Sequence, residues 1–182
     1  MAAANNQEIE ERYLLAGKPD IGDIKPSQIM QGYLFRSFER TVRYRIEIMP
    51  DESVNAFETI KGPKTGNAGS EVETAYPLLD AVQKLLECGS ENIILKDRYR
   101  VPTENGLVWE IDGFKRRLSG LWIAEIELPA QDTQYLKPAW LKGVNITEDR
   151  SFANAKLVDV DEAELKEMVR KVLEPAGLKS NL

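Results

Sequence analysis

The chain of 182 residues contains no histidine and a single cysteine, Cys88. The lack of histidine excludes Ser-His-Asp and Cys-His catalysis, His-ligated zinc and the usual general base near neutral pH. A lone cysteine excludes an intrachain disulfide and any CxxC metal or redox motif, and Cys88 is expected to be a buried helix residue. Hydrolytic chemistry would therefore have to rest on carboxylates, cations and metal ions.

Long apolar runs and a phosphate-binding glycine loop are also missing. No stretch approaches the roughly 20 apolar residues of a membrane span, and the polar start does not have the pattern of a leader, so we expect a cytoplasmic protein with no membrane partner. Residues 61–66 lack the GxxxxGK[ST] spacing of a P-loop and are expected to form a turn. The net charge of −6 argues against general binding of nucleic acid, although a local basic channel is compatible with it.

What the chain does contain is a repeated two-residue alternation of apolar and polar side chains. A length of 182 residues with 42% hydrophobic content fits one globular domain. Eight runs alternate as strands do, with turn residues between them: 7–14, 28–35, 41–48, 56–61, 70–75, 93–101, 107–114 and 121–128. Because strands and helices do not alternate along the chain, the pattern predicts an α+β fold, an antiparallel sheet or barrel with helices outside.

Two segments, 76–89 and 159–173, have apolar residues at helical spacing. Gly89 suits a left-handed position after the first helix, and Asp161 with Glu164 has capping-box spacing for the second. A weaker helical turn is expected within 130–141. We expect both apolar stripes to face the core; the first consists of Leu78, Leu79, Val82, Leu85 and Leu86.

Like charges gather on the polar faces of the expected strands. Residues two apart share a strand face, so Arg43 and Arg45 lie together, away from their apolar neighbours. The same sorting by sign recurs in Glu8/Glu10, Glu71/Glu73, Lys96/Arg98/Arg100, Glu110/Asp112 and Glu125/Glu127. Such neighbours repel, so they need counter-charges, metal ions or a charged ligand. Ion pairs on a solvated face are one solution; a common interior that holds hard cations and phosphate oxygens is the other.

The ordered series of motifs resembles the CYTH family, the triphosphate tunnel metalloenzymes. The opening residues 8–12, EIEER, look like the family's ExExK signature. The resemblance runs in order from Glu8 to about Leu157, through TVRYRI at 41–46, TIKG at 59–62, KDRY at 96–99, WEID at 109–112, AEIEL at 124–128 and the closing segment 147–154.

The resemblance implies an eight-stranded antiparallel β-barrel that forms a tunnel, with helices packed outside. It would span residues 8–182 as a single domain, including the helix at 159–173, after a disordered tail at 1–7. The family's activities are inorganic, thiamine and RNA triphosphatase and class IV adenylate cyclase, all with a divalent metal, here Mg²⁺ or Mn²⁺. The short chain favours hydrolysis of inorganic tripolyphosphate to pyrophosphate and phosphate. A cyclase, a thiamine triphosphatase and a non-catalytic polyphosphate or nucleotide binder are the alternatives, and a homodimer is left open.

The resemblance also assigns site residues. Metal ligands would be Glu8, Glu10, Glu110, Asp112, Glu125 and Glu127. The substrate's phosphates would meet Arg43, Arg45, Lys61, Lys96, Arg98 and Arg150, and the catalytic set would be Glu10, Arg12 and Glu127. Three positions depart from the family pattern: Arg12 replaces a lysine, Ala75 replaces a carboxylate, and Ser151 replaces an arginine, with Arg150 one place earlier.

Overall fold

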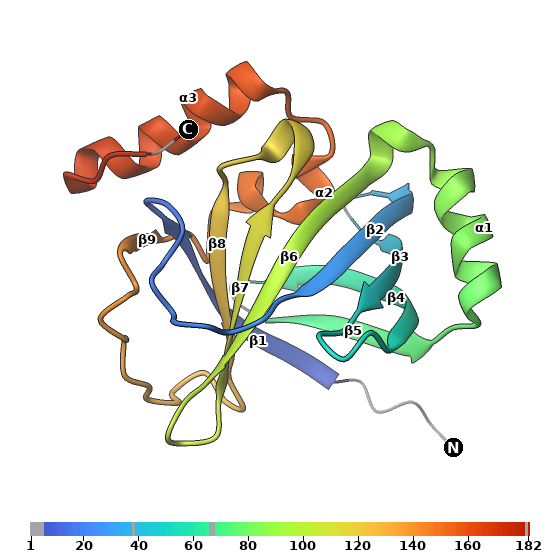
Figure 1. Cartoon of the computed structure of the whole chain (residues 1–182), viewed down its shortest axis with the longest axis horizontal. Helices are drawn as coiled ribbons and strands as arrows, with labels where there is room; N and C mark the ends of the chain where they lie inside the picture. Colours follow the sequence, from blue (N-terminus) through green and yellow to red (C-terminus); the bar gives the residue numbers. More distant parts are fainter. Residues whose placement is uncertain (1–5, 38, 66–67, 181) are drawn as a thin grey trace.

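A computed structural model describes residues 6–37, 39–65, 68–180 and 182, without the side chains of 6–8, 63–65, 68 and 69. Within these ranges nine strands form one antiparallel sheet that curves strongly around its own axis (Figure 1). The strands are β1 (Asn6–Leu15), β2 (Ser27–Arg36), β3 (Thr41–Ile48), β4 (Val54–Thr65), β5 (Ala68–Ala75), β6 (Ile93–Pro102), β7 (Val108–Phe114), β8 (Trp122–Glu127) and β9 (Gly143–Asn145).

The strand order is β5-β4-β3-β2-β6-β7-β8-β1-β9. The backbone of residues 6–9 in β1 also pairs with residues 68–71 in β5. The first strand in this order is therefore hydrogen-bonded to the eighth. As a result, the polar faces of β3 to β5 lie across from those of β7, β8 and β1 rather than in one plane.

In the part of the chain that the structure describes, three α-helices lie outside the sheet: α1 (Leu78–Cys88), α2 (Asn154–Leu157) and α3 (Glu162–Leu173). Helix α1 packs over β2, β3 and β4, and α3 packs near β1 and β9 (Figure 1). A glycine allows the close approach of α1, because a Cβ on Gly32 would come within 2.8 Å of Leu85 and 3.1 Å of Cys88. Asp161 caps α3 by accepting a hydrogen bond from the Glu164 amide at 2.8 Å, as its spacing predicts.

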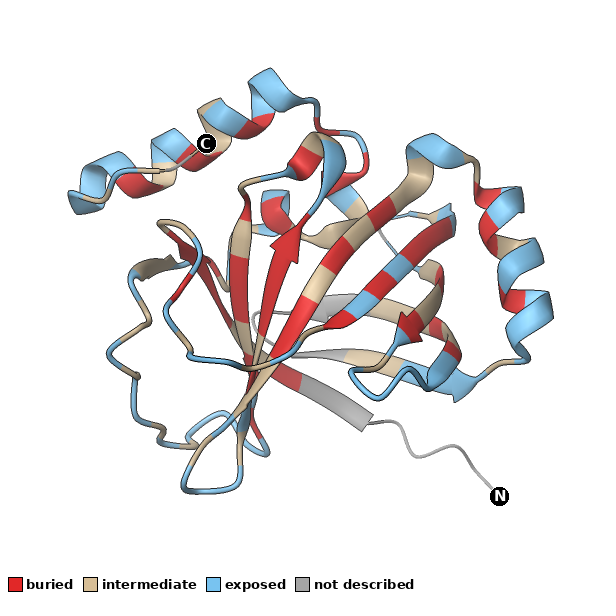
Figure 2. Ribbon diagram, in the orientation of Figure 1, coloured by how far each residue is buried: buried red, intermediate tan, exposed pale blue. Residues whose placement is uncertain are grey.

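The apolar stripe predicted for α1 is only partly correct. The helix buries Ala81, Leu85 and Cys88, but Leu79 and Leu86 are 82% and 78% exposed. Figure 2 shows both buried and exposed stretches along this helix. The helix is thus rotated so that the small Ala81 and Cys88 meet the sheet, and most of the leucine face is turned to solvent. For α3 the prediction is confirmed, because Leu165, Val169 and Leu173 are buried.

The hydrophobic core lies on the outer side of the sheet. One cluster joins Leu14, Phe114 and Ile123 to α3, and a second surrounds Trp109 beneath the segment that follows β8. That segment, at 130–141, packs Tyr135 and Trp140 edge-on against the Trp109 ring. It contains no helix, so the helical turn expected there is wrong. The segment is positioned by its ring contacts with Trp109 and not by the hydrogen bonds of a helix.

The α+β class, with an antiparallel sheet and helices outside it, is confirmed. Each of the eight expected runs corresponds to a strand, but the three-residue β9 was not expected. The first residues of β1 are Asn6, which the sequence places in the tail, and Gln7, which it places at the junction of the tail and the first strand run. In the described part of the chain, no helix is long and apolar enough to cross a membrane.

Candidate functional site: a cavity with two charged walls

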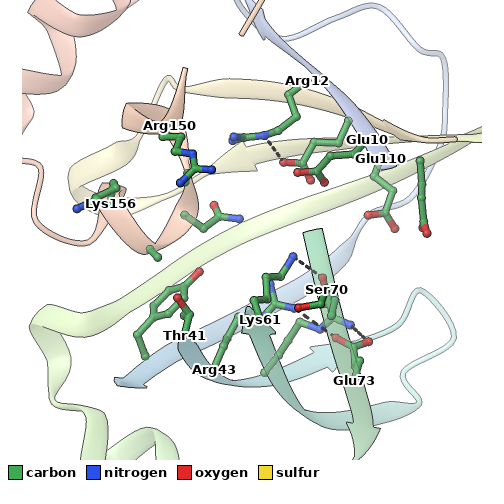
Figure 3. Close-up of a pocket in the computed structure, with 18 of the residues that line it drawn as sticks. Glu10, Arg12, Thr41, Arg43, Lys61, Ser70, Glu73, Glu110, Arg150 and Lys156 are labelled. Atoms are coloured by element: carbon green, nitrogen blue, oxygen red, sulfur yellow. Dashed lines mark hydrogen bonds and ion pairs between the residues drawn. The ribbon is translucent and has the colours of Figure 1, made fainter. Parts of the chain in front are cut away.

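The inward face of the sheet surrounds a cavity of about 1430 Å³. Two groups of charged side chains face each other across it (Figure 3). We call Arg43, Arg45 and Lys61, on β3 and β4, the basic wall. We call Glu10, Glu110, Glu125 and Glu127, on β1, β7 and β8, the acidic wall. Because strand residues alternate between faces, the same alternation that puts apolar residues under the helices puts these charges inside.

Two carboxylates on β5 partner the basic wall. Glu73 accepts hydrogen bonds from Arg45 Nη2 at 2.7 Å, Arg43 Nη2 at 3.3 Å and Thr59 Oγ1 at 2.8 Å. Glu71 forms ion pairs with Lys61 and, at 3.6 Å, with Arg43. The cations of the basic wall therefore already have counter-charges, which like charges on one strand face need because they repel each other.

The guanidinium groups of the basic wall are incompletely paired. The Nε atoms of Arg43 and Arg45 are buried, and neither has a hydrogen-bond partner among the described residues. Burial, followed by the nearby charge of Arg43, lowers the pKa of Arg45. A buried N–H without an acceptor is costly. With three cations lining one side of the cavity, this wall is suited to receive an anion with several oxygens.

The acidic wall is assembled by cross-strand register. Glu10 stands directly opposite Glu127 in the β1–β8 pair, and Glu110 stands opposite Glu125 in the β7–β8 pair. Like charges directly opposite each other are unfavourable unless cations compensate them. Arginines supply this compensation here: Arg12 Nε donates to Glu125 at 2.9 Å, and Arg100 Nε donates to Glu110 at 3.1 Å.

The arginines of the acidic wall are held by several bonds each. Arg12 also donates through Nη2 to the backbone carbonyl of Phe152 at 2.6 Å, at the end of the turn η3 (Arg150–Phe152). Arg100 Nη1 also donates to Glu47 at 2.6 Å. Burial would raise the pKa of Glu47, but the hydrogen bond and charge of Arg100 hold it below its ordinary value. These arginines are therefore fixed before any ligand arrives.

Beneath the acidic wall lies a buried ionic group. Lys96 and Asp112 are 2% and 1% exposed and do not line the cavity, whereas Arg98 does. Lys96 Nζ donates to Asp112 at 2.5 Å. Burial and the charge of Arg98 lower the pKa of Lys96 to about 8, against the attraction of Asp112. Burial raises the pKa of Asp112, but Arg98 and Lys96 outweigh it and hold that pKa well below its usual range.

The cavity brings together most of the residues assigned from the sequence. Those that line it are Glu10, Arg12, Arg43, Arg45, Lys61, Arg98, Glu110, Glu125, Glu127 and Arg150. Lys96 and Asp112 lie behind the wall instead, and the side chain of Glu8 lies outside the described residues. Other lining residues were not assigned, among them Arg100 and Tyr33. Arg100 continues the two-residue spacing of Lys96 and Arg98, so the sequence contained a signal for it, whereas the charge pattern gave none for Tyr33.

The two other departures from the family pattern lie in different places. Ala75 pairs with Phe57 at the end of β5 and is not among the cavity residues. Ser151 hydrogen-bonds Asp149 at 2.6 Å, while its neighbour Arg150 lines the cavity (Figure 3). A cation is therefore present at the cavity edge despite the shift of one position.

Fold and site together define a class: an antiparallel sheet that encloses a charged cavity, with cations on one wall and carboxylates on the other. No protein-family model matches the chain. A curated inorganic triphosphatase of Acetivibrio thermocellus is 33% identical over 152 residues, which cover 84% of this chain and 93% of that protein. An inorganic triphosphatase of Nitrosomonas europaea is 27% identical over 82% of this chain and 95% of its own length.

A solved structure agrees with these relatives. The crystal structure of an inorganic triphosphatase matches with a TM-score of 0.57 at 26% identity, covering 87% of this chain and 95% of that one. The chain belongs to the CYTH family, the triphosphate tunnel metalloenzymes.

Proposed function

We propose that the protein hydrolyses a triphosphate group with a divalent metal, and that its substrate is inorganic tripolyphosphate, cleaved to pyrophosphate and phosphate. The observation that carries the proposal is the cavity itself, where a basic wall faces an acidic wall. The names of the two curated relatives support the choice of substrate.

We also propose that the sheet is an eight-stranded barrel and that the cavity is a tunnel through it. The pairing of β1 with β5 supports this, because it joins the two ends of an eight-strand row. In a barrel, alternate residues of every strand point inward. That geometry accounts for charged residues from all of β1 and β3 to β8 lining one space.

The acidic wall has the donor chemistry that Mg²⁺ or Mn²⁺ prefers, since all its members offer carboxylate oxygens. Glu10 and Glu127, opposite each other across β1 and β8, would hold the ion together with Glu110 and Glu125. When bound, the ion would neutralise phosphate charge and make a water molecule more acidic. Mg²⁺ and Mn²⁺ are therefore both to be tested.

The protein's own groups would then divide the work. The basic wall would bind the phosphate oxygens and hold the chain of phosphates in line for attack by water. Arg12 and Arg98, fixed by their own hydrogen bonds, would offset the charge that builds up as pyrophosphate leaves. Glu10 and Glu127 would accept hydrogen bonds from the attacking water and orient it.

A non-catalytic polyphosphate binder is the second candidate, and one observation favours it. Among the described side chains, no three carboxylates are gathered as a ready metal site. Glu110 and Glu125 contact arginines instead, so a metal would have to compete with Arg12, Arg98 and Arg100 for them.

Phosphate release by the purified protein tests the proposal. Tripolyphosphate, ATP and thiamine triphosphate are each incubated with Mg²⁺, with Mn²⁺ and with EDTA. We expect fastest release from tripolyphosphate, and none in EDTA. Tight binding of tripolyphosphate by calorimetry without release in either metal would establish the binder instead. Formation of cyclic AMP from ATP would identify a cyclase.

A further inference from the structure

Asp112 and Arg98 form an ion pair with two contacts behind the acidic wall. They stand directly opposite each other on β7 and β6. Asp112 Oδ1 accepts from Arg98 Nε and Oδ2 accepts from Arg98 Nη2, both at 2.7 Å. This two-point contact fixes both the place and the plane of the guanidinium group.

Lys96 anchors the carboxylate from behind. Its Nζ reaches the same Oδ2 atom at 2.5 Å, so three donors from two cations converge on Asp112. Asp112 is only 1% exposed and is not among the residues that line the cavity. A metal ion could reach this carboxylate only by breaking bonds in a group that is costly to disrupt when buried.

Arg98 connects the buried Asp112 to the cavity surface. While Nε and Nη2 are held by Asp112, Nη1 forms an ion pair with Glu110, and Nη2 lies 3.4 Å from Glu125. Both of these glutamates line the cavity, as does Arg98 itself. The outer end of the guanidinium is thus presented to the space where the substrate would lie.

We propose that Asp112, anchored by Lys96, is a positioning residue that holds Arg98 toward the triphosphate, and that it is not a metal ligand. This inference rests on the proposed function. It replaces the metal role that the family resemblance assigns to Asp112 and the phosphate-binding role that it assigns to Lys96. Metal binding is then left to the carboxylates that line the cavity.

The test compares Asp112→Asn with the wild-type protein in three measurements. These are KM and kcat for tripolyphosphate, the Mg²⁺ or Mn²⁺ concentration giving half-maximal rate, and the Kd for tripolyphosphate in EDTA by calorimetry. We expect KM and the metal-free Kd to rise by about 10- to 100-fold, the effect of losing charged hydrogen bonds. The half-saturating metal concentration should stay within about twofold of wild type.

Asp97→Asn is the matched control. Asp97 is the β6 neighbour of both Lys96 and Arg98 on the outer face, where it pairs with Lys115 at 2.7 Å. It should leave KM, kcat, the half-saturating metal concentration and the metal-free Kd unchanged. If Asp112→Asn does not fold, Lys96→Met, which removes only the anchor, should shift the metal-free Kd in the same direction by a smaller factor.

A double substitution isolates the path through Arg98. Arg98→Lys has no guanidinium group for Asp112 to orient. In that background, Asp112→Asn should therefore change the metal-free Kd far less than it does in the wild type. An unchanged metal-free Kd with a tenfold or greater rise in half-saturating metal would overturn the inference and make Asp112 a ligand. A wild type that neither binds nor hydrolyses tripolyphosphate would instead refute the proposed function.

Discussion

The two walls of the cavity hold their charges in different ways. On the basic wall, Arg43 and Arg45 each meet Glu73 through Nη2, and their buried Nε atoms have no acceptor in the described residues. On the acidic side, Arg12 and Arg98 are each fixed by several bonds, including a backbone carbonyl and the buried Asp112. The difference suggests a division of work. Under the proposed function, the basic wall would exchange its carboxylate partners for the ligand, and the opposite wall would be organised in advance.

The largest expected effect concerns turnover at the acidic wall. Glu127→Gln keeps the shape of the side chain but removes the charge that would hold metal and orient water. We expect kcat to fall by about 100- to 1000-fold, with little change in the metal-free Kd for tripolyphosphate. Glu11→Gln is the control, because Glu11 lies on the outer face of β1 and hydrogen-bonds Tyr135. An equal loss of kcat in Glu127→Gln and Glu11→Gln would contradict the assignment of turnover to the inward face of the sheet.

The next effect concerns binding at the basic wall. Lys61→Ala removes one of its three cations, so the Kd for tripolyphosphate in EDTA should rise by about 10-fold or more. Lys115→Ala, which removes a cation on the outer side of the sheet, should leave this Kd unchanged. Calorimetry measures both. A Lys61 variant that binds normally but turns over slowly would place Lys61 with the catalytic groups instead.

A smaller effect of opposite sign is expected for the counter-charges. Glu73→Gln weakens the hold of β5 on Arg43 and Arg45, so the phosphates compete with a neutral group instead of a carboxylate. We expect the metal-free Kd to fall by about three- to tenfold. A weaker affinity would mean that Glu73 orients the two arginines rather than occupying their place.

The smallest effect concerns how the stability contributed by the Glu47–Arg100 pair depends on pH. The Arg100 hydrogen bond holds the pKa of Glu47 below its ordinary value, so the folded state binds this proton less readily than the unfolded state. The stability contribution is therefore present above the ordinary glutamate pKa and is lost as pH falls through the lowered value. Thermal melts should show Glu47→Gln less stable than wild type by about 1–2 kcal/mol at pH 7. The difference should shrink toward pH 3; a constant difference would contradict this linkage.

The strands and the inward direction of the charges could be predicted from the sequence, because both follow from a period of two. The alternation around Trp109 places apolar residues outside and Glu110 inside, and the structure has them so. The depth to which each charged side chain is buried could not be predicted in the same way. Glu110 and Asp112 have the same spacing and face, yet only Glu110 lines the cavity, because register puts Asp112 against both Lys96 and Arg98.

Other features were beyond the sequence for physical reasons. The helical period of α1 gives the direction of its apolar face, but the close approach at Gly32 selects Ala81, Leu85 and Cys88 for burial. The strand β9 has three residues, too few for a period to show. The pairing of Glu73 with two arginines depends on the neighbouring positions of β3, β4 and β5, which no local pattern contains.

The division of work between the walls is tested most directly by calorimetry in EDTA, with tripolyphosphate titrated into Lys61→Ala and Glu10→Gln side by side. We predict that Lys61→Ala loses about 10-fold or more in affinity, while Glu10→Gln binds at least as tightly as wild type, because it removes a negative charge from the cavity that the phosphates would enter. An equal or greater loss of metal-free affinity in Glu10→Gln would contradict the assignment of separate binding and metal walls.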